Sequence, residues 1–114
     1  MSVKLTTRQV GDVTVVDAVG RITLGDGAST FRDTVRDLAA SGKKKLLLNL
    51  AEVSYIDSSG IGEMVSGFTT VTNQVGQVKL LNLTKRVKDL LQITKLYTVF
   101  EVFEDEAAAV RSFS

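Results

Sequence analysis

The segment of this sequence best suited to chemistry is Asp57-Ser58-Ser59-Gly60. It follows an apolar stretch typical of a strand and precedes an amphipathic stretch typical of a helix. Its two hydroxyls therefore lie where the backbone N–H groups of a helix have no partner. A helix start also favours negative charge, by about 0.3–1 kcal/mol on an exposed surface. The pattern indicates a place where hydroxyl groups and an anion are both accommodated.

Two glycines follow at positions 60 and 62. The plain alternative is that Asp57 and the serines only cap the helix, each contributing about 1 kcal/mol. Two glycines inside an amphipathic helix cost it about 1–2 kcal/mol relative to alanines, and capping alone does not need them. Because glycine removes side-chain bulk, the pair predicts that another macromolecule approaches the backbone at this point.

The composition excludes several functional classes. The 114 residues include no cysteine and no histidine, which removes thiolate chemistry, the Ser-His-Asp triad and most transition-metal sites. We therefore expect no enzyme activity, no catalytic residues, no cofactor and no metal. The 14 Lys+Arg and 13 Asp+Glu leave a net charge of +1, with no basic excess for nucleic acid. No apolar run approaches about 18 residues, and the start lacks a signal-peptide pattern. We expect a cytoplasmic protein that contacts no membrane.

Strand and helix patterns alternate along the chain, which we interpret as one domain, 1–114. Gly11-Asp12 predicts a turn that joins the first two strands into a hairpin, with Gly20 ending the second strand. Further strands are predicted at 45–50, 78–83 and 99–103, and helices at 28–39, 59–73, 87–93 and 105–113. The repeated strand–helix units predict an α/β fold, with a mixed, mostly parallel sheet, an antiparallel N-terminal edge strand and four helices.

Helix ends carry capping signals as well. Asp26 or Ser29 is predicted to cap the first helix and Thr84 the third. Asp105 is predicted to start the fourth helix, and Gly42 suits a left-handed helix end. The apolar residues of the second helix are expected to face inward; they are Ile61, Met64, Val65, Phe68, Val71 and Val75.

The block from Asn49 to Gly62 resembles the signature of STAS domains. Asn49-Leu50 closes a buried strand, and Val53-Ser54-Tyr55-Ile56-Asp57-Ser58-Ser59-Gly60-Ile61-Gly62 follows. The block is similar, more narrowly, to that of bacterial anti-sigma factor antagonists of the sporulation and general-stress type, and length and element order also match over the whole chain. The resemblance implies a protein-binding module controlled by phosphorylation.

The resemblance also implies a mechanism, partner switching. The unphosphorylated protein sequesters a serine kinase that doubles as an anti-sigma factor, and phosphorylation releases it. A PP2C-type phosphatase reverses the modification. The matching phospho-acceptor is Ser58, and the matching partner-binding residues are Asp57, Ser59, Gly60, Ile61, Gly62 and Thr23. Thr23 stands in Gly20-Arg21-Ile22-Thr23-Leu24 where many members carry an acid, so the usual kinase contact is altered.

Other interpretations remain beside this one. Asp57 also suits a response-regulator receiver, but the first half of the chain has no adjacent acidic pair for Mg²⁺. A nucleotide-hydrolysing enzyme would need a phosphate-binding loop that is absent. A STAS domain also serves as a non-switching regulatory subunit of a sensory complex or a transport ATPase. Lys43–Lys45 and the cluster Lys85, Arg86 and Lys88 are interpreted as solvated faces, the latter alternatively as a rim contact for an acidic partner.

Overall fold

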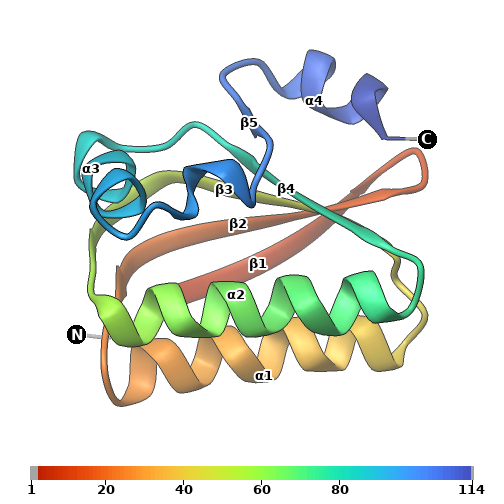
Figure 1. The fold of residues 1–114 in the computed structure, drawn as a ribbon. Coiled ribbons are helices and arrows are strands. Elements are labelled where there is room, and N and C mark those ends of the chain that lie inside the picture. The colour runs from red at the N-terminus through yellow and green to blue at the C-terminus, as the bar shows by residue number, and fades with distance from the viewer. Residues whose placement is uncertain (1–2, 114) are drawn as a thin grey trace.

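Alternating and continuous apolar runs build one five-stranded sheet in the computed structural model, which describes residues 3–113 (Figure 1). The strands are β1 (Val3–Val10), β2 (Val13–Ile22), β3 (Lys45–Ile56), β4 (Gln77–Leu81) and β5 (Val102–Phe103). They lie in the order β1-β2-β3-β4-β5. Only β1 runs antiparallel, as the partner of β2 in the predicted hairpin, and the other neighbours are parallel. The predicted fold class is confirmed.

Helices cover both faces of this sheet. One face is covered by α1 (Asp26–Ala40) and α2 (Ser58–Asn73), and α3 (Lys85–Ile93) and α4 (Glu106–Ser112) lie over the two ends of the other face (Figure 1). A short 3₁₀ turn, η1 (Leu96–Thr98), leads from α3 toward β5. Within residues 3–113, no helix combines the length and the apolar character needed to cross a bilayer.

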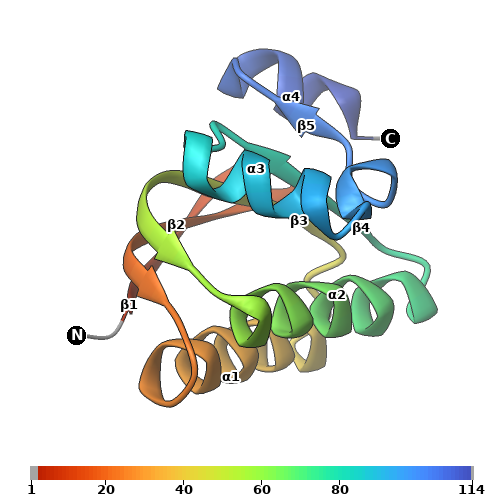
Figure 2. The ribbon, with the colours of Figure 1, turned by 60° about the vertical axis from the view of Figure 1, so that its left-hand side comes forward.

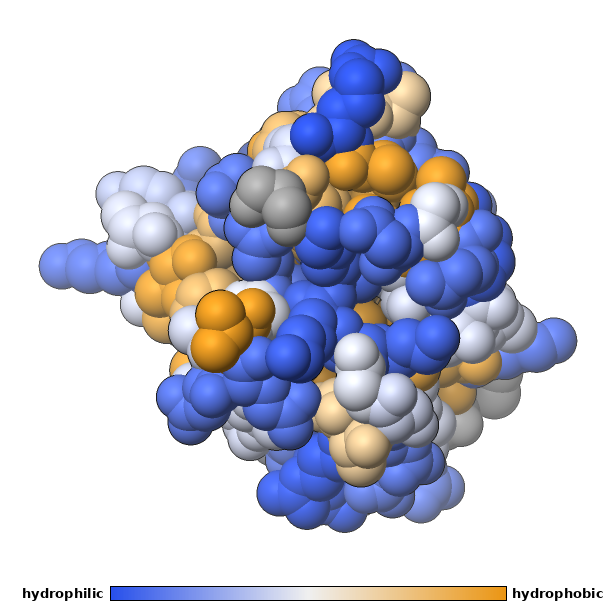
Figure 3. Space-filling view, turned by 90° about the vertical axis from the view of Figure 1, so that its right-hand side faces the viewer, coloured by the Kyte–Doolittle hydropathy of each residue, from blue (hydrophilic) through white to orange (hydrophobic). Residues whose placement is uncertain are grey.

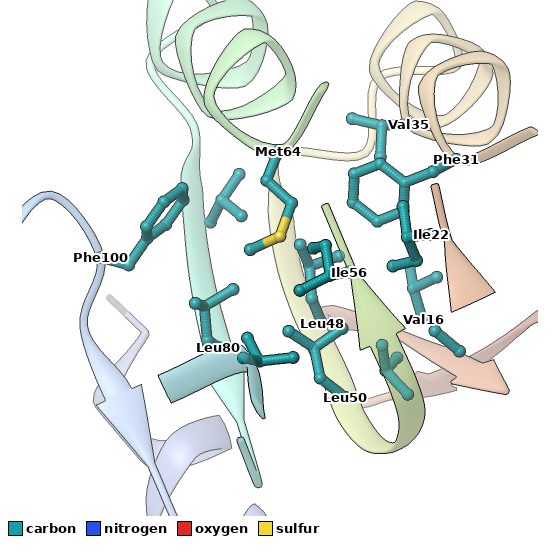
Figure 4. Packing of buried hydrophobic residues seen from close by; sticks show 14 of the residues in the cluster. Val16, Ile22, Phe31, Val35, Leu48, Leu50, Ile56, Met64, Leu80 and Phe100 are labelled. Atoms are coloured by element: carbon teal, nitrogen blue, oxygen red, sulfur yellow. The ribbon is translucent and has the colours of Figure 1, made fainter. Parts of the chain in front are cut away.

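The main core lies between the sheet and the pair α1 and α2. Side chains from both helices point onto the buried strands (Figure 4). Phe68 and Phe100 close one border of this core, with ring centroids 5.3 Å apart in an edge-to-face arrangement. The residues labelled in the close-up are Val16, Ile22, Phe31, Val35, Leu48, Leu50, Ile56, Met64, Leu80 and Phe100. Burial on both faces explains the near-continuous apolar run Leu46-Leu47-Leu48 in β3.

A second, smaller apolar cluster lies under α4. It contains Val13, Val15, Leu47, Leu81, Ala109 and Phe113. Polar contacts fasten the helix over it: Arg8 of β1 bonds to Glu106, and the ammonium of the buried Lys79 lies 2.9 Å from the Ser112 hydroxyl. The predicted start of this helix at Asp105 is confirmed to within one residue: α4 begins at Glu106, and the Asp105 carboxylate caps it by accepting the Ala108 N–H at 2.9 Å.

The sheet extends further than predicted. Gly20 does not end β2, which continues to Ile22 alongside an extended β3 with the pairs Gly20↔Val53, Arg21↔Tyr55 and Ile22↔Ile56. Two register shifts let the strands stay paired past the glycine. In contrast, β5 contains only Val102–Phe103 rather than 99–103. Val99 has a helical backbone as the C-cap of η1, and its N–H donates to the Leu96 carbonyl at 2.9 Å, so the chain is not extended there.

Of the three predicted helix-end signals at α1 and α3, two are right. Thr84 accepts the Val87 N–H at 3.4 Å, and Gly42 after α1 has a left-handed φ of 82°. Neither Asp26 nor Ser29 caps α1, because Gly25 occupies the N-cap position and makes no side-chain bond. Val75 was predicted to face inward, which is wrong. It lies past the end of α2 with φ 61°, and it is 89% exposed.

Candidate functional site

The candidate site lies where β2 and β3 end side by side. Ile22 pairs with Ile56 as the last partners of the two parallel strands. The loop from Thr23 to Gly25 and the start of α2 therefore meet at the carboxyl edge of the sheet, where open α/β sheets place their functional loops. Figure 2 brings this edge forward and shows α3 lying above the start of α2.

Asp57 ties these two segments together. Its carboxylate accepts the N–H of Gly60 at 3.0 Å, as the N-cap of α2, and the N–H of Leu24 at 3.0 Å. Burial opposes its ionisation, but the N–H groups of Leu24, Gly60 and Ser59 outweigh burial and hold the pKa of this carboxyl below its usual value. The charged carboxylate thus fixes the 23–25 loop against the helix start.

Ser58 is the first residue of α2 and is exposed. Its hydroxyl makes no hydrogen bond to any of residues 3–113. Ser59, the neighbouring candidate, is partly buried. The arrangement leaves one unpaired hydroxyl facing solvent at the positive end of a 16-residue helix dipole.

The two glycines of the motif have different surroundings. Gly60 is buried, and a Cβ there would collide with the backbone carbonyl oxygen of Ile22 and the side chain of Ile56. The interpretation of Gly60 as an opening for another macromolecule is therefore wrong, because its missing side chain lets α2 pack on β2. Gly62 is exposed and has nothing within 4 Å of its Cβ position. Only Gly62 leaves open space at the surface.

The remaining predicted partner contacts divide between surface and core. Ile61 is 4% exposed and belongs to the main core, so its side chain does not reach the surface. Thr23 is partly buried, and its carbonyl accepts the Ala28 N–H at 2.8 Å in the first turn of α1. The sequence interpretation missed Leu24, which is 79% exposed beside Asp57. An apolar residue in a polar loop was the available signal.

A groove runs from Ser58 to α3. It measures about 390 Å³ and is lined by Tyr55, Ile56, Asp57, Ser58, Arg86, Asp89, Leu90 and Ile93. The four residues from α3 recur at helical spacing, so they share one face of the helix. Ile93 lies at this face with 76% of its surface exposed. The helical spacing of these residues is visible in the sequence. The sequence does not show that this face of α3 lies opposite Ser58.

Arg86 is more than part of a solvated face. Its guanidinium stacks over the Tyr55 ring at 4.2 Å from the centroid, while Lys85 pairs with Asp89 at 2.8 Å. Lys88 lines a separate hollow with Ala51, Thr84 and Glu104. The three cations of this cluster therefore have three different environments.

The geometry defines a class of protein: a small α/β domain with an exposed serine and an open groove at one edge of its sheet. The family model described as the STAS domain matches residues 4–109. The chain belongs to the STAS domain family.

Relatives within this family were compared in sequence and in structure. The chain is 32% identical over 102 residues to an anti-sigma-B factor antagonist of Bacillus subtilis, covering 90% of this chain and 92% of the relative. The crystal structure of a putative anti-sigma factor antagonist from Thermotoga maritima superposes with a TM-score of 0.89 at 22% identity, covering 96% of this chain and 93% of the other.

The Bacillus protein SpoIIAA, also an anti-sigma factor antagonist, offers two comparisons. Its unphosphorylated form superposes with a TM-score of 0.71 at 17% identity, covering 96% of this chain and 100% of the other. Its phosphorylated form does so with a TM-score of 0.75 at 18% identity, covering 95% and 97%. These structures show that the fold is shared.

Proposed function

We propose that this chain is an anti-sigma factor antagonist that binds an anti-sigma factor through the surface around Ser58. Phosphorylation of Ser58 ends the binding. The observation that carries the proposal is the exposed, unpaired hydroxyl of Ser58 at the first position of α2, next to the carboxylate that fixes the 23–25 loop. The name of the relative from Bacillus subtilis supports the kind of partner.

The fold is expected to tolerate a phosphoryl group at this position. Phosphorylation adds a charge of about −1.5 to −2, which changes the net charge from +1 to about −1. The new charge lies at the positive end of the α2 dipole, and the side chain of Ser58 is exposed, so a phosphoryl group on it points into solvent rather than into the core. We therefore expect the phosphorylated chain to remain folded.

The partner interface is expected to lose its affinity. Two exposed apolar side chains, Leu24 and Ile93, lie on the two segments that adjoin Ser58 and offer anchors for a partner. A phosphoryl group between them adds bulk, repulsion and the cost of removing its water. A loss of about 3–4 kcal/mol weakens binding several-hundred-fold, which is enough for a switch.

The modifying partners follow from the same proposal. The anti-sigma factor is a serine kinase that transfers the γ-phosphoryl group of ATP to the Ser58 oxygen, leaving ADP, and the serine proton is released. A PP2C-type phosphatase hydrolyses the phosphoserine back to serine and phosphate. The chain supplies the acceptor oxygen and no catalytic group, and the reactions take place in the cytoplasm. Asp57, Ser59, Gly62 and Thr23 border the contact.

Isolation of the partner from the native cell tests this function. We expect a kinase of the anti-sigma type to co-purify with the chain, and mass spectrometry to find phosphate on Ser58. Ser58→Ala should bind the kinase constitutively, and Ser58→Asp should bind it weakly while melting within a few degrees of the unmodified chain. Ser66 is an exposed serine on the same helix, so Ser66→Asp serves as the matched control.

Equal affinity of Ser58→Ala and Ser58→Asp would exclude the switch. It would leave the chain as a non-switching STAS regulatory subunit, the second role that its family allows.

A further inference from the structure

Two guanidinium groups lie against one tyrosine next to the phospho-acceptor. Arg21 and Tyr55 are cross-strand partners in β2 and β3, and the Arg21 guanidinium lies 5.2 Å from the Tyr55 ring centroid. Arg86 approaches the same ring from α3, at 4.2 Å. Both arginines are exposed, and neither forms an ion pair with a carboxylate of residues 3–113. The cluster therefore holds two positive charges without a counter-ion.

The other two charged groups of the groove already have hydrogen-bond partners. The Asp57 carboxylate accepts the N–H groups of Leu24 and Gly60, each at 3.0 Å. Asp89 is bound by Lys85, at 2.8 Å. Arg86 is thus the charged group of the Ser58 groove that has neither a hydrogen bond nor an ion pair among the described residues, since its contact is with the Tyr55 ring.

We propose that Arg86, supported by Arg21 and Tyr55, receives the phosphoryl group carried by Ser58 of the same chain. The inference rests on the proposed function in one respect, the use of Ser58 as the acceptor. A guanidinium binds phosphate oxygens through two parallel hydrogen bonds, which an ammonium group cannot do. Stacking on Tyr55 orders the guanidinium beforehand, so less conformational freedom is lost when the phosphate binds.

The contact would change the groove as well as the charge. Ser58 belongs to the segment on one side of the groove and Arg86 to α3 on the other. A phosphate that joins them closes the space in which a partner's side chains would lie beside Leu90 and Ile93. It also neutralises Arg86, which removes a positive charge from the surface of this chain that would contact the partner. In the phosphorylated chain, the groove between Ser58 and α3 is then filled by the chain's own phosphate.

The chain with phosphoserine encoded at position 58 tests this without any partner. The second ionisation of the phosphate is followed by ³¹P NMR as a function of pH. Because Arg86 stabilises the dianion, we expect its pKa to be lower than in the Arg86→Gln variant, by about half a unit or more. Arg86→Lys should restore only part of that shift.

Lys88→Gln is the matched control, since it removes the same charge from the same helix but from a different hollow. It should change the phosphate pKa by no more than about a fifth of the change seen in Arg86→Gln, because exposed charges outside the contact are screened. A second readout is the Arg86 Nε–H resonance, which should move on phosphorylation of Ser58. Inorganic phosphate added to the unmodified chain at equal concentration should not move it.

Equal phosphate pKa values in the wild-type chain and Arg86→Gln would overturn the proposal, as would an equal shift in Lys88→Gln. An Arg86 resonance that responds to free phosphate and not to phosphoserine would overturn it too. Arg86 would then be available to form an ion pair with a carboxylate of the partner. None of these results bears on whether a kinase binds the chain. Conversely, failure to find a kinase leaves the titration unchanged.

Discussion

Gly60 and Gly62 are separated by one residue on α2 but have different surroundings. At Gly60 the backbone of α2 approaches Ile22 of β2 so closely that no side chain fits between them. Gly62 faces open solvent. The first glycine is therefore a requirement of the fold, and the second is a candidate requirement of binding.

Paired alanine substitutions separate these purposes. Gly60→Ala should destabilise the fold by about 1–3 kcal/mol, because the added methyl group overpacks the contact with Ile22 and Ile56. Gly62→Ala should stabilise the chain by about 0.5–1 kcal/mol, since alanine is the better helix former. Urea unfolding of both variants measures the difference. A destabilised Gly62→Ala variant, or a neutral Gly60→Ala variant, would contradict it.

For single residues, the sequence predicts the capped helix start that carries Ser58 but not which of the residues around it reach the surface. The order Asp57-Ser58-Ser59-Gly60 is a local pattern, and Asp57 does cap the helix that it precedes. The buried position of Gly60 depends on β2, which is distant in the sequence. The Arg86–Tyr55 stack likewise depends on how α3 is laid over the sheet. Such tertiary contacts leave no periodic signal.

The turn between α2 and β4 carries strain that the fold does not need. Val75 has a left-handed φ of 61°, which a β-branched residue rarely adopts, and it is 89% exposed. Val75→Gly removes about 1–2 kcal/mol of backbone strain and costs about 0.5–1 kcal/mol in chain entropy. A modest net gain in unfolding free energy is expected in thermal or urea unfolding.

Val75→Ala is the control for this gain, since it retains a Cβ and therefore most of the strain. Loss of stability in Val75→Gly would show that the turn is not strained as described.

The last helix depends on one buried cation. Lys79 is 5% exposed, and its ammonium donates to the Ser112 hydroxyl at 2.9 Å and to the Ser112 carbonyl at 3.0 Å. It also lies 4.9 Å from the Phe113 ring centroid. Lys79→Met keeps the packing of the stem and loses these bonds, so it should cost about 1–3 kcal/mol.

Amide hydrogen exchange should locate the stability lost in Lys79→Met. The amides of α4 should exchange faster, and those of α2 should stay as protected as in the unmodified chain. Lys88→Met, an exposed lysine, is the control and should change little. Faster exchange spread evenly over the domain would contradict a local role for Lys79.

At the scale of elements, most of the fold is predictable. Buried strands and amphipathic helices each leave a periodic pattern, and the four predicted helices all form. The errors lie at ends: the continuation of β2 past Gly20, the short β5 and the exposed Val75. Strand ends are decided by pairing with distant segments, which the local sequence does not record.

The whole molecule responds to pH mainly through its carboxylates. Hydrogen bonds from Arg8 hold the pKa of Asp17 and of Glu106 below their usual values. The pKa of Asp57 is lowered as well, where backbone N–H groups outweigh burial. A carboxylate whose folded pKa is depressed stabilises the fold above its unfolded pKa, and that contribution is lost as the pH falls through the folded value.

Because the chain contains no histidine, the unfolding free energy should be nearly constant from about pH 5 to 8 and should fall below about pH 4. Urea unfolding at a series of pH values checks this. Arg8→Gln should reduce the loss between neutral and acid pH, because the pKa values of its two carboxylates then return toward normal. A maximum of stability below pH 4 would contradict the assignment.

The molecule concentrates its candidate site at one end. The carboxyl edge of the sheet holds Ser58, the groove and the exposed Leu24 and Ile93. The opposite end, shown in Figure 3, is largely hydrophilic, with its apolar residues in small separate groups. A partner that responds to Ser58 is therefore expected to dock at the carboxyl edge.

Calorimetric titration of the isolated kinase with the unmodified chain and with the chain phosphorylated on Ser58 tests this account most directly. Melting curves of both forms are recorded alongside. We predict nearly equal melting temperatures and a several-hundred-fold weaker affinity for the phosphorylated form, in line with a loss of about 3–4 kcal/mol. Equal affinities, or a phosphorylated chain that binds weakly only because it has unfolded, would contradict it.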